Sequence, residues 1–348
     1  MKRILSFILS ACLFALLFAG CTKIPEKPKF EDATTAPSDK KVTTTSSAPE
    51  EPMTVKLSVS KGPAAYGMVY LFDSIDNKNS LGDYEYEIVD DSAAAADKVA
   101  AGECQIAAVN TEDALRLYKT AKDKVQIIAI SSFSNFYFVE LGEVTLLKNV
   151  NTLTGKFYVP NGSILEPVMT AIFNSLENED LTIITQFDRD ALMGLVEKNR
   201  VMHAALPEPY ATQAVEKSTN EHVGVDVSDL WENLVQNTDY ADSKICGTCI
   251  IANKDFLNTH PKATAYFLKE FKASVKNVNS QTTAPDLLVN YKLAEDAEQA
   301  KSLIGSSSIV CKTKDDMKDI FVGFMKVLSE NGAAVDVPDV NFFYMKSY

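Results

Sequence analysis

Strand-like segments alternate with helix-like segments along most of this chain, and this alternation restricts the folds that it can adopt. The stretch "TVKLSVSKG" at 54–62 alternates apolar and polar residues and ends in glycine, as is typical of a β-strand. Helical periodicity follows, and strand-like stretches recur at 84–91 ("YEYEIVDD") and 104–110 ("CQIAAVN"). Strands that alternate with helices in this way indicate a mostly parallel sheet flanked by helices. We therefore predict an α/β fold.

The pattern starts again near residue 140 and then returns to the first unit. A second set of strand and helix patterns fills 140–245, and "CGTCIIAN" at 246–253 is typical of a buried strand that rejoins the first sheet. We predict two lobes, one formed by residues 54–139 with 246–348 and the other by 140–245. Each lobe is expected to hold a mostly parallel sheet. Two crossing segments would let such lobes close on a bound molecule.

The N-terminus has the features of a secretion signal. Lys2 and Arg3 precede an apolar run at 4–19 that is shorter than the roughly 20 residues a membrane-spanning helix needs. Ala19-Gly20-Cys21 resembles the lipobox of bacterial lipoproteins, although Phe18 stands where Leu is more usual. The resemblance implies a signal peptide at 1–21, lipidation of Cys21 and a position on the outer face of the bacterial cell membrane. The alternative is an ordinary secreted protein that is cleaved nearby.

Residues 22–53 are predicted to form a disordered tether. They are rich in Thr, Ser, Pro and Lys and contain few large apolar residues. Such a segment cannot bury enough surface to offset its conformational entropy. It would leave the folded part attached to the membrane yet free to reach.

The charge balance excludes one class of partner. The chain has 47 acidic and 34 basic residues, a net charge of -13. An acidic surface repels phosphate backbones, so we expect no nucleic-acid binding. It also disfavours electrostatic adhesion to anionic lipid, which makes a covalent anchor more useful.

Cysteine and histidine patterns give little sign of a metal or redox site. "CGTC" at 246–249 has the spacing of redox and zinc motifs, but no second such pair and no nearby histidine accompany it. We expect Cys104, Cys246, Cys249 and Cys311 to be buried thiols, with one or two structural disulfides as the alternative. No metal and no cofactor are predicted.

Four segments, in order, resemble the substrate-binding proteins of ABC importers for sulfonates, nitrate, taurine and thiamine-pyrimidine precursors. They are "AAGECQIAAVNTEDAL" (100–115), "VNTLTGKFYVPNGSILEPVM" (150–169), "HAALPEPYAT" (203–212) and "VPDVNFFY" (337–344). The resemblance implies a two-lobed, type II periplasmic-binding-protein-like fold. It also implies a monomer that captures a small molecule between its lobes and delivers it to an ABC permease.

The sequence departs from this family in two places. Val340 and Asn341 replace more usual acidic residues near the C-terminus. Beyond the signal, the arginines are Arg116, Arg189 and Arg200, and none lies in the loops that we place at the cleft. A bidentate clamp for sulfonate is therefore missing from its expected places, which favours a planar or weakly charged ligand.

Candidate ligand-binding residues follow from one rule. In open α/β sheets, ligands bind at the carboxyl ends of the strands and the start of the next helices. Three loops and the "PEP" turn of 207–209 satisfy this rule here. Their candidate residues are Gly62, Tyr66, Ser132, Phe133, Asn135, Phe136, Gly162, Ser163 and Glu208.

Several of these candidates have a purely structural alternative. Tyr66 can simply pack on the sheet, and Ser163 can simply cap the helix that follows it. Glu208 can meet an amine of the ligand or cap the helix after Pro209. Trp231, the only tryptophan, is expected to pack rather than to stack on a ligand.

Enzyme functions have weaker support. The sequence has no G-x-S-x-G, GxGxxG or Walker A motif, and its three histidines lack metal-ligand spacing. The family that it resembles includes a pyrimidine synthase with a cysteine-dense motif and a catalytic histidine. The predicted first lobe has neither of them before residue 139, only Cys104. We therefore expect no enzyme. A structural or signalling surface lipoprotein is the other alternative.

Cys21→Ser is expected to leave the protein unprocessed or released from the membrane, because the thiol is the predicted attachment point of the lipid. Membrane fractionation and the mass of the N-terminus check this. A variant that is processed normally and stays bound to the membrane would show that the lipobox assignment is wrong.

Overall fold

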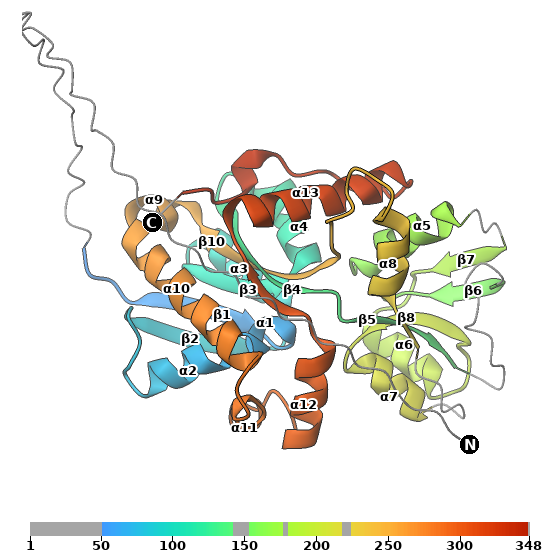
Figure 1. The fold of residues 1–348 in the computed structure, drawn as a ribbon, viewed down its shortest axis with the longest axis horizontal. Helices are drawn as coiled ribbons and strands as arrows, with labels where there is room; N and C mark the ends of the chain where they lie inside the picture. The colour runs from blue at the N-terminus through green and yellow to red at the C-terminus, as the bar shows by residue number, and fades with distance from the viewer. Residues whose placement is uncertain (1–50, 142–152, 177–179, 218–223, 347–348) are drawn as a thin grey trace, which may run out of the picture. The chain divides into compact units, whose positions relative to one another are not determined.

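The computed structural model describes residues 51–141, 153–176, 180–217 and 224–346, which form two β-sheets flanked by helices (Figure 1). The predicted signal peptide at 1–21, Cys21 and almost all of the tether lie outside the described residues. Among the described residues, no helix combines the length and the apolar character needed to cross a membrane. We call each sheet with its helices a lobe. The α/β, two-lobed fold class predicted from the sequence is confirmed.

The first sheet has six strands in the order β11-β4-β10-β3-β1-β2. Its strands are β1 (Val55–Ser60), β2 (Tyr84–Val89), β3 (Ile106–Asn110), β4 (Val125–Phe133), β10 (Cys246–Asn253) and β11 (Ile309–Lys312). Strand β1 pairs parallel with β2 and β3, whereas β10 runs antiparallel between β3 and β4. The prediction that 246–253 returns to the first sheet is confirmed.

The second sheet has five strands in the order β7-β6-β8-β5-β9. They are β5 (Phe136–Glu140), β6 (Gly155–Tyr158), β7 (Leu181–Ile184), β8 (His203–Pro207) and β9 (Val225–Asp226). The predicted boundary between 139 and 140 falls within β5, but the whole strand belongs to the second sheet, where it pairs antiparallel with β8 and β9. Because β5 and β10 run against their neighbours, both sheets are mixed rather than mostly parallel.

Helices follow most strands. The first lobe contains α1 (Pro63–Tyr66), α2 (Val69–Asp76), α3 (Ser92–Ala101), α4 (Thr111–Ala121), α9 (Lys254–Thr259), α10 (Pro261–Val278), α11 (Ala284–Asn290), α12 (Ala297–Ser306) and α13 (Lys314–Glu330). The second contains α5 (Leu165–Ser175), α6 (Arg189–Val196), α7 (Tyr210–Lys217) and α8 (Val227–Val235). Asp188 caps α6 by accepting from the N–H of Ala191, and Asp91 caps α3 by accepting from the N–H of Ala93.

One hydrophobic cluster is shared by both sheets. It contains Val109 of the first sheet and Phe138 of the second, together with buried residues of α13. Phe324 of α13 contacts Trp231 of α8, with ring centroids 5.2 Å apart. Trp231 is 1% exposed and its Nε1 donates to the carbonyl of Ser243 at 3.2 Å, which confirms the packing interpretation. In Figure 1, α13 lies close to both lobes, and its contacts with β4 and α5 agree with this.

Free thiols are packed against the hydrophobic clusters, three in the shared cluster and Cys311 against another one in the first lobe. Cys104, Cys246 and Cys249 are buried and Cys311 is half-buried. The Sγ of Cys249 lies 3.4 Å from the hydroxyl of Thr111. Burial raises the pKa of Cys249 to about 12, so this thiol stays protonated and unreactive near neutral pH.

Phe324→Ala is expected to lower the free energy of unfolding by about 3–5 kcal/mol, because it removes a buried ring from the cluster that both sheets share. Chemical denaturation followed by circular dichroism measures this. The matched control is Val340→Ala at a residue that is 56% exposed, where a change within about 0.5 kcal/mol is expected. Equal losses for both variants would contradict the role given to α13.

Candidate functional site

A cavity of about 590 Å³ lies where strand ends of both sheets meet, within the size range of small-molecule sites. From the first lobe it is lined by loops that follow β1, β2 and β3 and by part of β10. From the second lobe it is lined by the start of β5 and by segments after β6, β7 and β8. We call this cavity the cleft.

The structure brings most of the predicted site residues to the cleft. They are Gly62, Tyr66, Asn135, Phe136, Gly162, Ser163 and Glu208. Ser132 and Phe133 do not line it, which corrects the prediction for these two. Both belong to β4, where Ser132 pairs with Thr248 and Phe133 with Cys246, so they lie within the sheet and not in a loop beyond it.

Ser132 and Phe133 have other surroundings. Ser132 is fully buried, and its hydroxyl lies 2.7 Å from the hydroxyl of Thr248. Phe133 lines a separate cavity of about 210 Å³ beside Trp231. Thr248 itself reaches the cleft, so the hydroxyl of Ser132 can only position a residue that lines it.

Tyr66 belongs to the hydrophobic core of the first lobe and also lines the cleft. Gly62 before α1 has a φ of +114°, a conformation that favours glycine, and Pro63 opens the short helix. This turn places the Tyr66 ring in the core, with 4% of the residue exposed. Burial raises the pKa of Tyr66 to about 12, with smaller contributions from Tyr210 and Glu208 of the second lobe. The hydroxyl of Tyr66 therefore lies within electrostatic reach of the opposite lobe.

Asn135 lies where the chain passes from β4 of the first lobe to β5 of the second, and it forms hydrogen bonds with Glu208. The N–H of Glu208 donates to the carbonyl of Asn135 at 3.0 Å, and the Asn135 amide donates back to the Glu208 carbonyl at 3.4 Å. The Glu208 carboxylate accepts from the N–H and the hydroxyl of Thr212, at 3.2 and 2.9 Å. Glu208 thus has the capping role proposed as one alternative, while it also lines the cleft.

The turn at 160–164 differs from the prediction. Helix α5 begins at Leu165, and Ser163 gives it no side-chain cap. The hydroxyl of Ser163 instead donates to the carbonyl of Pro160 at 2.8 Å. Gly162 has a φ of +71°, which glycine adopts readily. Ser163 can still accept a hydrogen bond from a molecule in the cleft, but its own proton is already engaged.

Sequence reasoning missed the basic residues of the cleft. Arg189 lines it, which corrects the prediction that no arginine reaches the binding loops. Its guanidinium lies over the ring of Tyr210, 4.3 Å from the centroid, and its Nε is 3.7 Å from Asp190. Lys61 lines the opposite lobe and forms an ion pair of 2.5 Å with Asp90. Both cations follow strands, so the strand-end rule could have found them.

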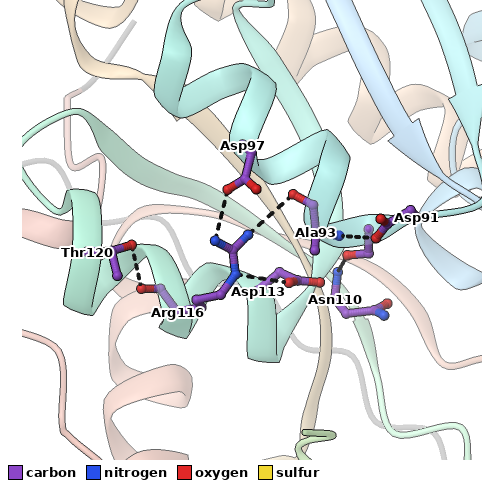
Figure 2. A network of polar contacts seen from close by, with 8 residues as sticks. Asp91, Ala93, Asp97, Asn110, Asp113, Arg116 and Thr120 are labelled. Atoms are coloured by element: carbon purple, nitrogen blue, oxygen red, sulfur yellow. Dashed lines mark hydrogen bonds and ion pairs between the residues drawn. The ribbon is translucent and has the colours of Figure 1, made fainter. Parts of the chain in front are cut away.

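A polar network holds the start of α4 against α3 (Figure 2). The guanidinium of Arg116 donates to Asp97 at 2.9 Å and to the carbonyl of Ala93 at 3.3 Å. The N–H of Asn110 donates to the hydroxyl of Ser92 at 2.8 Å. Asn110 and the adjoining first turn of α4 are thereby fixed at the wall of the cleft.

Glu112 in that first turn is the most perturbed carboxyl of the cleft. Burial raises its pKa to about 7, and the nearby Asp113 adds to this. The N–H groups of Glu112 itself and of Ile164, in the opposite lobe, lower the pKa only in part. Among the described residues, no lysine, arginine or histidine forms an ion pair with Glu112.

Comparison with known proteins identifies the fold. No family model and no curated protein sequence matches the chain. Solved structures do match. An ABC transporter protein from Parabacteroides distasonis is 19% identical with a TM-score of 0.64, covering 84% of this chain and 99% of its own. The periplasmic aliphatic sulphonate-binding protein of Escherichia coli is 13% identical with a TM-score of 0.66, covering 85% and 94%.

Another similar structure is the ligand-binding component of an ABC-type import system from Staphylococcus aureus, solved with zinc bound. It is 11% identical with a TM-score of 0.65, covering 84% of this chain and 96% of its own. A Candida albicans protein described as having the generic periplasmic binding protein fold is 14% identical with a TM-score of 0.56, covering 83% and 93%. At these identities the likeness shows the fold, and the chain has the periplasmic-binding-protein fold.

Glu112→Gln is expected to stabilise the protein at pH 8 by on the order of 1–3 kcal/mol, because the ionised carboxylate is disfavoured in the folded state. A raised folded-state pKa means that the cost is absent below the unfolded-state pKa, grows as pH rises towards about 7 and is fully present above that. The gain should therefore shrink towards pH 5. Urea unfolding at both pH values measures it.

The matched control is Glu197→Gln at the exposed ion pair with Lys217, where no comparable gain is expected. A gain for Glu112→Gln that is equal at pH 5 and pH 8 would contradict the assigned pKa.

Proposed function

We infer that this chain is an extracytoplasmic solute-binding protein that holds a small molecule between its two lobes and delivers it to an ABC importer. The observation that carries this proposal is the cleft of about 590 Å³, lined by strand-end loops from both sheets. In open α/β sheets these edges are where ligands bind. A structural lipoprotein has no need of polar groups that converge on such a cavity.

The names of similar structures support the same class of function. Two of them are described as sulfonate-binding proteins, from Escherichia coli and from Xanthomonas axonopodis, the latter bound to MOPS. Others are described as components of ABC transporters. We propose binding without catalysis, since the first lobe up to residue 139 lacks the cysteine-dense motif and the histidine of the pyrimidine-synthase alternative.

The lining suggests how a molecule would be held. The rings of Tyr66, Phe136 and Tyr210 offer apolar faces, and Asn135, Ser163 and Glu208 offer polar edges. These groups come from both lobes, so a bound molecule would contact both at once. Enclosure between them would exclude water and strengthen each hydrogen bond.

The N-terminus supplies the location in this proposal. Lipidation at Cys21 would fix the chain to the outer face of the bacterial membrane, and the tether of 22–53 would let the lobes reach a permease. The protein would act as a monomer, because one chain contributes both walls of the cleft. We propose the division into a first lobe of 54–139 with 246–348 and a second of 140–245, with the first boundary moved ahead of β5 because that strand pairs within the second sheet.

A thermal-shift screen tests the proposed function. A compound at ~100-fold over its dissociation constant adds about 2.7 kcal/mol of stability. For the compound that raises the melting temperature most, Tyr66→Phe is expected to weaken binding by about 0.5–1.5 kcal/mol if the hydroxyl bonds it. Isothermal titration calorimetry measures this loss.

Tyr70→Phe is the matched control, because the Tyr70 hydroxyl contacts Thr283 and does not line the cleft. It should leave affinity unchanged. A broad library that contains no stabilising compound would sink the proposal. So would equal losses of affinity for the two variants.

A further inference from the structure

Resting on the proposed function, we propose that Glu112 binds a positively charged nitrogen group of the captured molecule. The preferred ligands would then be small organic cations, in which an amidinium, guanidinium or ammonium group is attached to a flat ring. This differs from the sulfonates named for some of the similar structures.

The position of Glu112 is suited to this role. It is the second residue of α4 and lines the cleft at the end of β3. Ile164 of the opposite lobe lines the same cavity, and its backbone N–H interacts with the Glu112 carboxyl. Arg116, one turn later in α4, forms ion pairs with Asp97 and Asp113 and does not pair with Glu112. Backbone N–H groups from both lobes thus interact with this carboxyl.

The other charges of the cleft are already engaged within the protein. Lys61 pairs with Asp90 across 2.5 Å, and Arg189 lies against Asp190 and over Tyr210. The carboxylate of Glu208 accepts two hydrogen bonds from Thr212. Among the described residues that line the cleft, acidic groups outnumber basic ones. This excess of acidic groups would repel a sulfonate, whereas a cationic ligand would be attracted to it.

The aromatic lining favours the same class of ligand. Tyr210 already holds a planar cation, since the guanidinium of Arg189 lies 4.3 Å from its ring centroid. Tyr66 and Phe136 present further rings to the cleft. A ring face attracts a cation within about 6 Å. The cleft therefore contains both a carboxyl group and aromatic rings with which a cationic ligand can interact.

Binding of a cation should depend on pH. The pKa of Glu112 near 7 leaves part of the carboxyl protonated at neutral pH, and a bound cation favours its ionised form. Charged and titratable groups that face this region are Lys61, Tyr66, Asp90, Asp113, Arg189, Asp190, Glu208 and Tyr210, and no described histidine lines the cleft. Affinity for a cation should therefore rise between pH 6 and pH 8.

The experiment uses the purified full chain and matched sets of compounds that share a ring and differ in the head group. One set is benzamidine, benzamide and benzenesulfonate, and further sets vary the ring. We expect a cationic member to raise the melting temperature most. Its affinity should fall at least ~10-fold in Glu112→Gln, the contribution of a charge-assisted bond, and stay within twofold in Glu197→Gln. Melting of each variant without compound confirms that it is folded.

Other outcomes overturn the inference in distinguishable ways. A preference for sulfonates that is lost in Arg189→Gln and kept in Glu112→Gln would overturn it, while the proposed function stands. A neutral compound as the best binder, a cation whose affinity Glu112→Gln leaves unchanged, or an affinity for the cation that does not rise from pH 6 to pH 8 would overturn it equally. If no compound of any charge stabilises the chain, both proposals fail.

Discussion

The hydrophobic cluster shared by the two sheets is the constraint on which the rest of the structure depends. Phe138 stacks on Phe157 within the second sheet, and α13 brings Phe324 onto Trp231. Each buried aromatic side chain removes a large apolar area from water. Protein interiors are close-packed, so a displacement of one sheet is transmitted to the other. Because both sheets share this core, the loops at their strand ends are held around one cavity.

The same arrangement explains the electrostatics of the cleft. An ionised acidic side chain in the first turn of a helix is ordinarily stabilised by the helix dipole. Glu112 has this position, but its carboxyl is desolvated at the wall of the cleft, and this desolvation outweighs the nearby N–H groups and raises its pKa. Arg189 and Lys61 are drawn to neighbouring carboxylates in their own lobes. The cleft therefore combines cations that are paired with carboxylates and a Glu112 carboxyl that forms no ion pair with any described lysine, arginine or histidine.

Much of this could be predicted from sequence, because strand and helix periodicity are local properties. The strand-end rule placed Tyr66, Asn135 and Glu208 correctly at the cavity. It failed for Ser132, since the end of β4 depends on pairing with the distant β10. It missed Arg189 because the loop after β7 was not considered. It missed Glu112 because the desolvation that raises its pKa arises from tertiary packing, which the periodicity of the sequence does not reveal.

Hydrogen exchange on the full chain, with and without the most stabilising compound, tests the central claim most directly. The account predicts protection in both lobes at once, at 62–66 and 110–112 of the first and at 161–165 and 207–210 of the second, because these segments line one cleft. Protection confined to one lobe, or to segments away from the cleft, would contradict capture between the lobes.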